Sequence, residues 1–150
     1  MFVERTEKIL ENIQPTRQIA PVALAFLGDT VFDLFLRTRI VMEEKTSPKN
    51  MHLHAAQYAK AQTQARMAKA IWDLLSEEEQ DTLRRGRNAK VNTVPKHAEV
   101  ADYKMATGFE AMLGELYLQK KEDRLWEILN LGMDAIRDQM GREVENERNR

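Results

Sequence analysis

The spacing of apolar residues is the feature that most restricts how this chain can fold. Apolar side chains recur at helical intervals, and no stretch alternates apolar and polar residues long enough to predict a strand. Helix-favouring residues such as Ala, Leu, Met, Glu, Gln, Lys and Arg are abundant, whereas the chain has only six glycines and four prolines. The sequence therefore predicts an all-α fold.

The length and the residue types limit what the chain can be. Its 150 residues suffice for one domain whose core needs neither disulfides nor a structural metal. The absence of cysteine excludes a thiolate zinc site and a cysteine nucleophile, and it fits a reducing cytosol. The sequence has no signal-peptide core and no apolar run of membrane-spanning length. We therefore expect a cytoplasmic protein with no membrane partner.

We expect one globular domain over residues 19–139, preceded by a charged lead-in at 1–18 and followed by a flexible polar tail at 140–150. Pro21 is suited to the first turn of a helix. The segment SEEE (76–79) has the form of a capping box, which predicts that a helix starts there. The expected helices cover about residues 21–44, 50–75 with a break near 62–63, 76–86, 99–119 and 123–139, and residues 87–98 are expected to form a loop.

The segment FLGDTVFDLF (26–35) places Gly28 and two aspartates inside an apolar helix. Asp29, Asp33 and Arg37 lie one turn apart, and such a polar stripe is typical of a solvent-facing surface with an Asp33–Arg37 ion pair. Exposure does not explain Gly28, because glycine in a helix interior costs about 1 kcal/mol relative to alanine. Its missing side chain would allow another backbone, a metal-bound water or a substrate phosphate to approach Asp29.

A further carboxylate lies among small and apolar residues in ATGFEAMLGELYL (106–118). Glu110 shares a helix face with Ala106 and Gly114. A lone glutamate usually reaches solvent along a helix edge. Alternatively, Asp29 and Glu110 would meet across a pair of helices and share a divalent cation. Mg²⁺ suits that arrangement, because it is commonly held by one or two carboxylates together with waters and substrate phosphates.

The segment RRGRNAKVNTVPKHA (84–98) is basic and contains no acid, although the formal net charge of the chain is −1. A positive potential would therefore be local to this segment. We interpret the segment as a phosphate-binding loop, with a merely solvated charged loop as the alternative. Its candidate binding residues are Arg84, Arg85, Arg87, Asn88, Lys90 and Lys96.

Three motifs occur in order along the chain: LAFLGDTVF (24–32), RRGRNAK (84–90) and FEAMLGELYL (109–118). Together they resemble the ribonuclease III catalytic domain, and most closely its short form, mini-ribonuclease III. The resemblance extends over about residues 19–130. By position, Asp29 corresponds to the aspartate of the family signature, and Glu110 corresponds to a glutamate far downstream of it.

The chain departs from the full family pattern at three acidic positions. Val22 and Ala25 stand where the signature has glutamates, and Thr107 stands where the downstream motif has an aspartate. Two of the four family carboxylates, Asp29 and Glu110, therefore remain, as in the short form. The length also leaves no room for the double-stranded-RNA-binding domain of the long family members.

The resemblance implies a helical homodimer in which each subunit brings one active site, so that both strands of double-stranded RNA are cut. It implies Mg²⁺ as the cofactor, Asp29 and Glu110 as metal ligands and catalytic residues, and Asp33 as a candidate outer-shell group. Residues 84–98 would then bind the RNA. The implied task is maturation of large-subunit (23S) ribosomal RNA, with a ribosomal protein that presents the RNA as a candidate partner.

Two other classes of function remain open. A non-catalytic double-stranded-RNA-binding protein could keep a ribonuclease III-like fold and use the basic segment without a metal. Such a protein would gain nothing from the negative charges of Asp29 and Glu110 near phosphate. A helical adaptor dimer would bind no nucleic acid. Whatever binding it shows would lack the salt dependence that is expected when a protein neutralises phosphates.

Overall fold

The computed structural model describes residues 8–11, 15–43, 47–90, 93–96 and 98–150. Every regular element in these ranges is a helix, which confirms the predicted all-α fold. The elements are η1 (Thr16–Gln18), α2 (Pro21–Glu43), α3 (Pro48–Tyr58), α4 (Ala61–Ile71), η2 (Trp72–Leu74), α5 (Glu77–Asn88), α6 (Val100–Leu118) and α7 (Glu122–Arg148).

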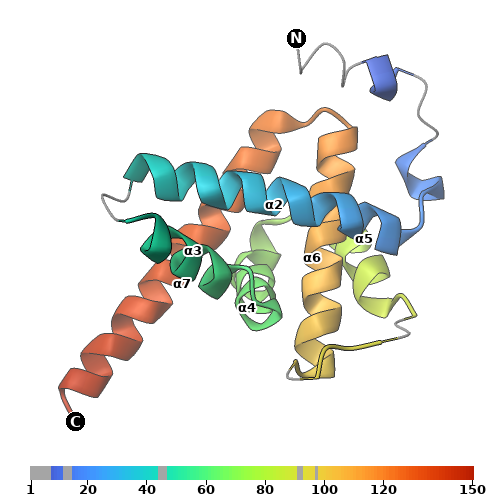
Figure 1. The fold of residues 1–150 in the computed structure, drawn as a ribbon. Coiled ribbons are helices and arrows are strands. Elements are labelled where there is room, and N and C mark those ends of the chain that lie inside the picture. The colour runs from blue at the N-terminus through green and yellow to red at the C-terminus, as the bar shows by residue number, and fades with distance from the viewer. Residues whose placement is uncertain (1–7, 12–14, 44–46, 91–92, 97) are drawn as a thin grey trace.

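Helix α6 is the central element of the fold. Figure 1 shows α2 lying across α6, and α6 also packs against α4, α5 and α7. The last part of α7 projects from the rest of the molecule in the same view. Within the described ranges, no helix is both long and apolar enough to cross a membrane. The residues carried by α6 are therefore surrounded by several other helices.

Local sequence explains where several helices begin. Pro21 and Pro48 occupy the first positions of α2 and α3, where the missing amide proton of proline costs no helical hydrogen bond. The capping box predicted at the start of α5 is confirmed. The Ser76 amide donates to Glu79 Oε1 (2.7 Å), and the Glu79 amide donates to Ser76 Oγ (3.2 Å).

Three boundaries differ from those expected. Helix α5 continues past Gly86 to Asn88, so the arginines of the basic segment lie on a helix and not in a loop. The break expected near 62–63 lies instead between the end of α3 and the start of α4 at Ala61. Helix α7 continues to Arg148, so the expected tail is helical, in keeping with the good helix propensity of its glutamates and arginines.

The core lies between α2, α4, α6 and α7. Phe32 of α2 meets Phe109 of α6 edge-on, with ring centroids 6.2 Å apart. Met67, Met112 and Met133 are almost fully buried, where their flexible side chains fill the remaining gaps. This packing fixes α2 relative to α6, and these two helices carry the predicted catalytic residues.

Helices α2 and α6 cross with their backbones in contact at two glycines. A Cβ atom on Gly28 would overlap the Glu110 carbonyl oxygen, and a Cβ atom on Gly114 would overlap the Leu24 carbonyl oxygen. The helices approach this closely only because both positions lack a side chain. Of the three explanations considered for Gly28, the structure shows the approach of another backbone. That approach brings Asp29 next to the helical turn that carries Glu110.

Candidate active site

Asp29 and Glu110 come together at the α2–α6 crossing. Asp29 directly follows Gly28, which touches the Glu110 backbone, and its charge acts on the Glu110 carboxyl. Asp29 is exposed, whereas Glu110 is partly buried. The two predicted ligands therefore form one site with an open side and an enclosed side.

The surroundings of Glu110 oppose its negative charge. Burial, and then the charge of Asp29, raise the pKa of Glu110 from 4.5 to about 8. The side-chain amide of Gln64 acts in the opposite direction, because a nearby donor favours the carboxylate. A cation between Asp29 and Glu110 would relieve their repulsion and favour the charged form of Glu110. The pair thus fits a divalent cation with oxygen ligands, such as Mg²⁺.

The raised pKa of Glu110 predicts a loss of stability at alkaline pH when no metal is bound. The folded state holds the Glu110 proton up to about pH 8, whereas the unfolded chain releases it near its ordinary pKa of 4.5. Raising the pH through this window therefore favours the unfolded chain. In urea titrations with EDTA, we expect the free energy of unfolding to fall on the order of 3 kcal/mol between pH 5 and pH 9. The variant Glu110→Gln should lack most of this fall, and an equal fall in that variant would contradict the assignment.

Gln64 of α4 is a site residue that sequence reasoning missed. Its side chain is only 1% exposed, and it lies near enough to Glu110 to lower the pKa of that carboxyl. It does not reach hydrogen-bond geometry: within the described residues, Gln64 Nε2 is buried without a hydrogen-bond partner. The only sequence signal is a polar residue on the buried, alanine-rich face of a helix, between Thr63 and Ala65.

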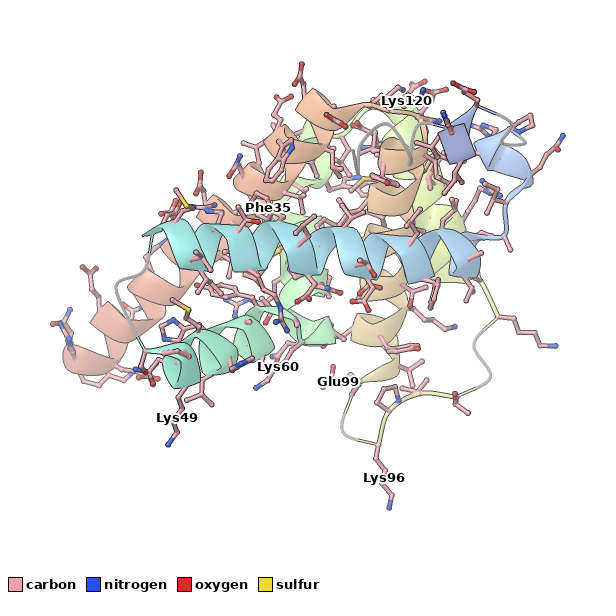
Figure 2. All side chains as sticks on the ribbon, turned by 45° about the horizontal axis from the view of Figure 1, so that its top comes forward. Phe35, Lys49, Lys60, Lys96, Glu99 and Lys120 are labelled. Atoms are coloured by element: carbon pink, nitrogen blue, oxygen red, sulfur yellow. The ribbon has the colours of Figure 1, made fainter. Side chains whose placement is uncertain are left out.

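A pocket of about 780 Å³ opens beside Glu110, between the start of α4 and the first half of α6. Figure 2 shows Lys60, Glu99 and Lys96 around the start of α6, with Lys96 extending outward from its loop. The pocket is large enough for a small polar ligand or part of a larger one. Its lining residues are Ala59, Lys60, Ala61, Gln62, Gln64, Pro95, Lys96, Ala98, Glu99, Asp102, Tyr103, Ala106, Thr107 and Glu110.

Asp33 forms an ion pair with a residue of its own helix. Arg37 Nε lies 3.0 Å from Asp33 Oδ2, and both side chains are about half exposed. The ion pair predicted from the spacing is confirmed. Asp33 is therefore turned to Arg37, one helical turn beyond Asp29.

The basic residues are spread along α5 and the following loop. Arg84 lies over the Trp72 ring, 5.7 Å from its centroid, and Arg87 Nε donates to Asn88 Oδ1 (3.3 Å). Arg85 Nη2 donates to the Arg17 carbonyl oxygen (3.1 Å), which fastens η1 to α5. Lys90 is exposed. Of the six candidates, Lys96 is the one that lines the Glu110 pocket.

Asp29 and Glu110 form a two-carboxylate arrangement. Among the residues that the structure describes, no group of three or more His, Asp or Glu side chains could hold a metal ion. Two carboxylates leave most coordination positions to waters and substrate oxygens, which is the usual situation for Mg²⁺.

Comparison with known proteins places this site within a matched family domain. The Ribonuclease III domain matches residues 22–121, a range that includes both Asp29 and Glu110. The Mini-ribonuclease 3 of a Thermoanaerobacter species is 45% identical over 137 residues, which cover 91% of this chain and 95% of that protein. The Mini-ribonuclease 3 of Clostridium tetani is 40% identical over 134 residues, which cover 89% of each chain.

A solved structure has the same fold. The crystal structure of a protein from Fusobacterium nucleatum superposes with a TM-score of 0.73 at 30% sequence identity. The matched region covers 81% of this chain and 98% of that chain. The helical arrangement is therefore shared over nearly the whole of the smaller protein.

Proposed function

Because this chain belongs to the ribonuclease III family and is an endoribonuclease of that family, we propose that it hydrolyses double-stranded RNA with Mg²⁺ at the Asp29–Glu110 pair. One observation carries the proposal. The α2–α6 crossing sets two carboxylates against each other, and burial with mutual repulsion raises the pKa of Glu110 to about 8. Such an arrangement is unfavourable without a cation and is typical of functional sites.

Both carboxylates would act as ligands of the cation. Asp29, on the open side, and Glu110, beside the pocket, would hold the cation through their oxygens, and neither has to transfer a proton. A bound Mg²⁺ supplies an activated water, orients the scissile phosphodiester and stabilises charge on the leaving oxygen. Asp33 would act through an outer-shell contact, for which its pair with Arg37 would have to open.

The basic residues of α5 and its following loop are proposed to hold the RNA. A-form RNA offers phosphates and 2′-hydroxyls in a shallow minor groove, and basic and amide side chains suit both. Arg84, Arg87, Asn88, Lys90 and Lys96 would contact the duplex. Arg85 belongs to the same set but also fastens η1, so its replacement would disturb the fold as well.

We propose a homodimer, as double-strand cleavage by one site per subunit requires. Helix α2 exposes an apolar surface: Phe26 is 83% exposed and Val22 is 52% exposed. Val22 and Phe26 lie one helical turn apart, and a contiguous exposed apolar surface of this kind favours an interface. In the cell, the substrate would be a large-subunit (23S) ribosomal RNA precursor, and a ribosomal protein could present it.

Phe26→Asp should convert the dimer into a monomer, because a charge would replace an aromatic side chain at the interface. Sedimentation equilibrium of the wild-type protein and the variant measures the change. Leu53→Asp is the matched control, since Leu53 is also exposed (60%) but lies on α3. A Phe26→Asp protein that remains dimeric, or a wild-type protein that is monomeric, would refute the proposed interface.

A cleavage assay separates the proposal from a non-catalytic RNA-binding protein with the same fold. Long double-stranded RNA, single-stranded RNA and duplex DNA of the same sequence are incubated with the protein in Mg²⁺ or in EDTA. We expect cleavage of the RNA duplex in Mg²⁺ and none in EDTA. Binding of the RNA duplex without cleavage under either condition would favour the non-catalytic alternative.

A further inference from the structure

The first turn of α4 faces the pocket. The N-cap residue of α4 is Lys60, whose side chain makes no capping hydrogen bond. The first amide protons of a helix have no intrahelical acceptor and carry the positive end of the helix dipole. Ala61 and Gln62, the first two residues of α4, both line the pocket. Their positive helix end is therefore directed at it.

Gln64 provides an independent observation at the same place. Its side chain is 1% exposed and lines the pocket, and Nε2 has no hydrogen-bond partner within the described part of the chain. Leaving a buried donor unpaired is unfavourable. A metal ion cannot satisfy an N–H group, because a cation has no lone pair with which to accept the hydrogen bond. An oxygen that enters the pocket would satisfy it.

Lysines and carboxylates both line the pocket, and Glu110 is a third carboxylate of the lining besides Glu99 and Asp102. Lys60 stands at the α4 wall and Lys96 at the rim. Glu99 and Asp102 lie on the opposite wall, at the start of α6, where they complement the dipole of that helix. The α4 wall thus combines a helix N-terminus, a lysine and a buried amide donor, which together favour an oxyanion.

We propose that the first turn of α4, Lys60 and Gln64 form a binding site for a phosphate group, at whose rim Lys96 lies. The pocket adjoins Glu110, so the occupant that the proposed function supplies is an RNA backbone phosphate next to the scissile one. This identification rests on the proposed function, whereas the phosphate site itself does not. Free inorganic phosphate has the same chemistry and is the other source to be tested.

The test compares Lys60→Ala with Lys49→Ala, a matched control at another exposed lysine that does not line the pocket. All measurements are made in EDTA, so the result does not depend on cleavage. A short RNA duplex is titrated at several salt concentrations. We expect Lys60→Ala to reduce the slope of log affinity against log salt by about one, and Lys49→Ala to leave it unchanged.

Inorganic phosphate provides the second probe, followed through the backbone amide resonances of Ala61 and Gln62. In the wild-type protein these resonances should shift on titration, and the shift should weaken several-fold in Lys60→Ala and in Gln64→Met. Melting temperatures verify that Gln64→Met is folded. If Gln64→Met is unfolded, the surface variant Lys60→Ala alone serves as the test of phosphate binding.

If Lys60→Ala lowers the salt slope of RNA binding and also weakens the phosphate-induced amide shifts, the site is supported and its occupant is the RNA backbone. If only the phosphate-induced amide shifts weaken, the site is supported and its occupant is free phosphate. No change with either probe overturns the proposal. A protein that binds phosphate in this way but never cleaves RNA would instead contradict the proposed function alone.

Discussion

Glu110→Gln should nearly abolish RNA cleavage and, at the same time, stabilise the metal-free protein at alkaline pH. The variant loses a proposed metal ligand, and even the loss of an outer-shell partner of a metal commonly costs about 10- to 100-fold in activity or affinity. We expect the loss of turnover to exceed that range. Stability should rise because the variant no longer places a buried negative charge beside Asp29.

Turnover of a labelled RNA duplex and urea unfolding in EDTA at pH 9 measure the two effects on one preparation. Asp29→Asn should show the same loss of cleavage. Glu122→Gln, at an exposed glutamate that begins α7, is the control and should change neither property. A Glu110→Gln protein with most of its activity would refute the role of Glu110. A Glu110→Gln protein that is inactive and also less stable than the wild-type protein would show that the Glu110 carboxyl supports the fold.

Gly28→Ala should destabilise the protein by about 3 kcal/mol or more and reduce cleavage. An added Cβ atom would overlap the Glu110 carbonyl oxygen, so α2 and α6 would have to separate at their crossing. Because Asp29 and Glu110 lie on either side of that crossing, their spacing would change as well. Chemical denaturation and the cleavage assay measure the two consequences.

Gly132→Ala is the matched control for this substitution. Gly132 is also a helical glycine, but the nearest atom to its added Cβ is Met67 Cβ at 3.5 Å, which is an ordinary contact. Removing glycine from a helix interior favours the helix by up to about 1 kcal/mol. Gly132→Ala should therefore be neutral or stabilising. Equal effects of the two substitutions would show that helix propensity, and not the crossing, determines the result at Gly28.

Local signals predicted the helices and their starts, but they misjudged where some helices end. Gly86 resembles a helix stop in the sequence, yet α5 continues past it. The reason is tertiary: a Cβ atom on Gly86 would lie 2.7 Å from the Gly108 Cα, so this glycine permits close packing of α5 on α6. A glycine required for helix packing and a glycine that ends a helix look the same in one sequence.

The candidate site was predictable only in part. The glycine next to Asp29 left the approach of another backbone as one of three explanations, and a meeting of Asp29 with Glu110 was one of two alternatives; the structure shows both. Gln64 was not predictable, because it reaches the site from a third helix whose placement depends on contacts distant in sequence. The sequence pattern identifies residues with a reason to be buried, whereas their partners follow from the fold.

Asp29 and Glu110 are proposed to hold one divalent cation together. Isothermal titration of Mg²⁺ into the wild-type protein and into Asp29→Asn and Glu110→Gln tests this proposal without RNA and without turnover. At neutral pH, we predict one site per chain in the wild-type protein, with proton release from Glu110 on binding, and loss of that site in each variant. Unchanged Mg²⁺ binding in either variant would contradict the joint role of Asp29 and Glu110 as ligands.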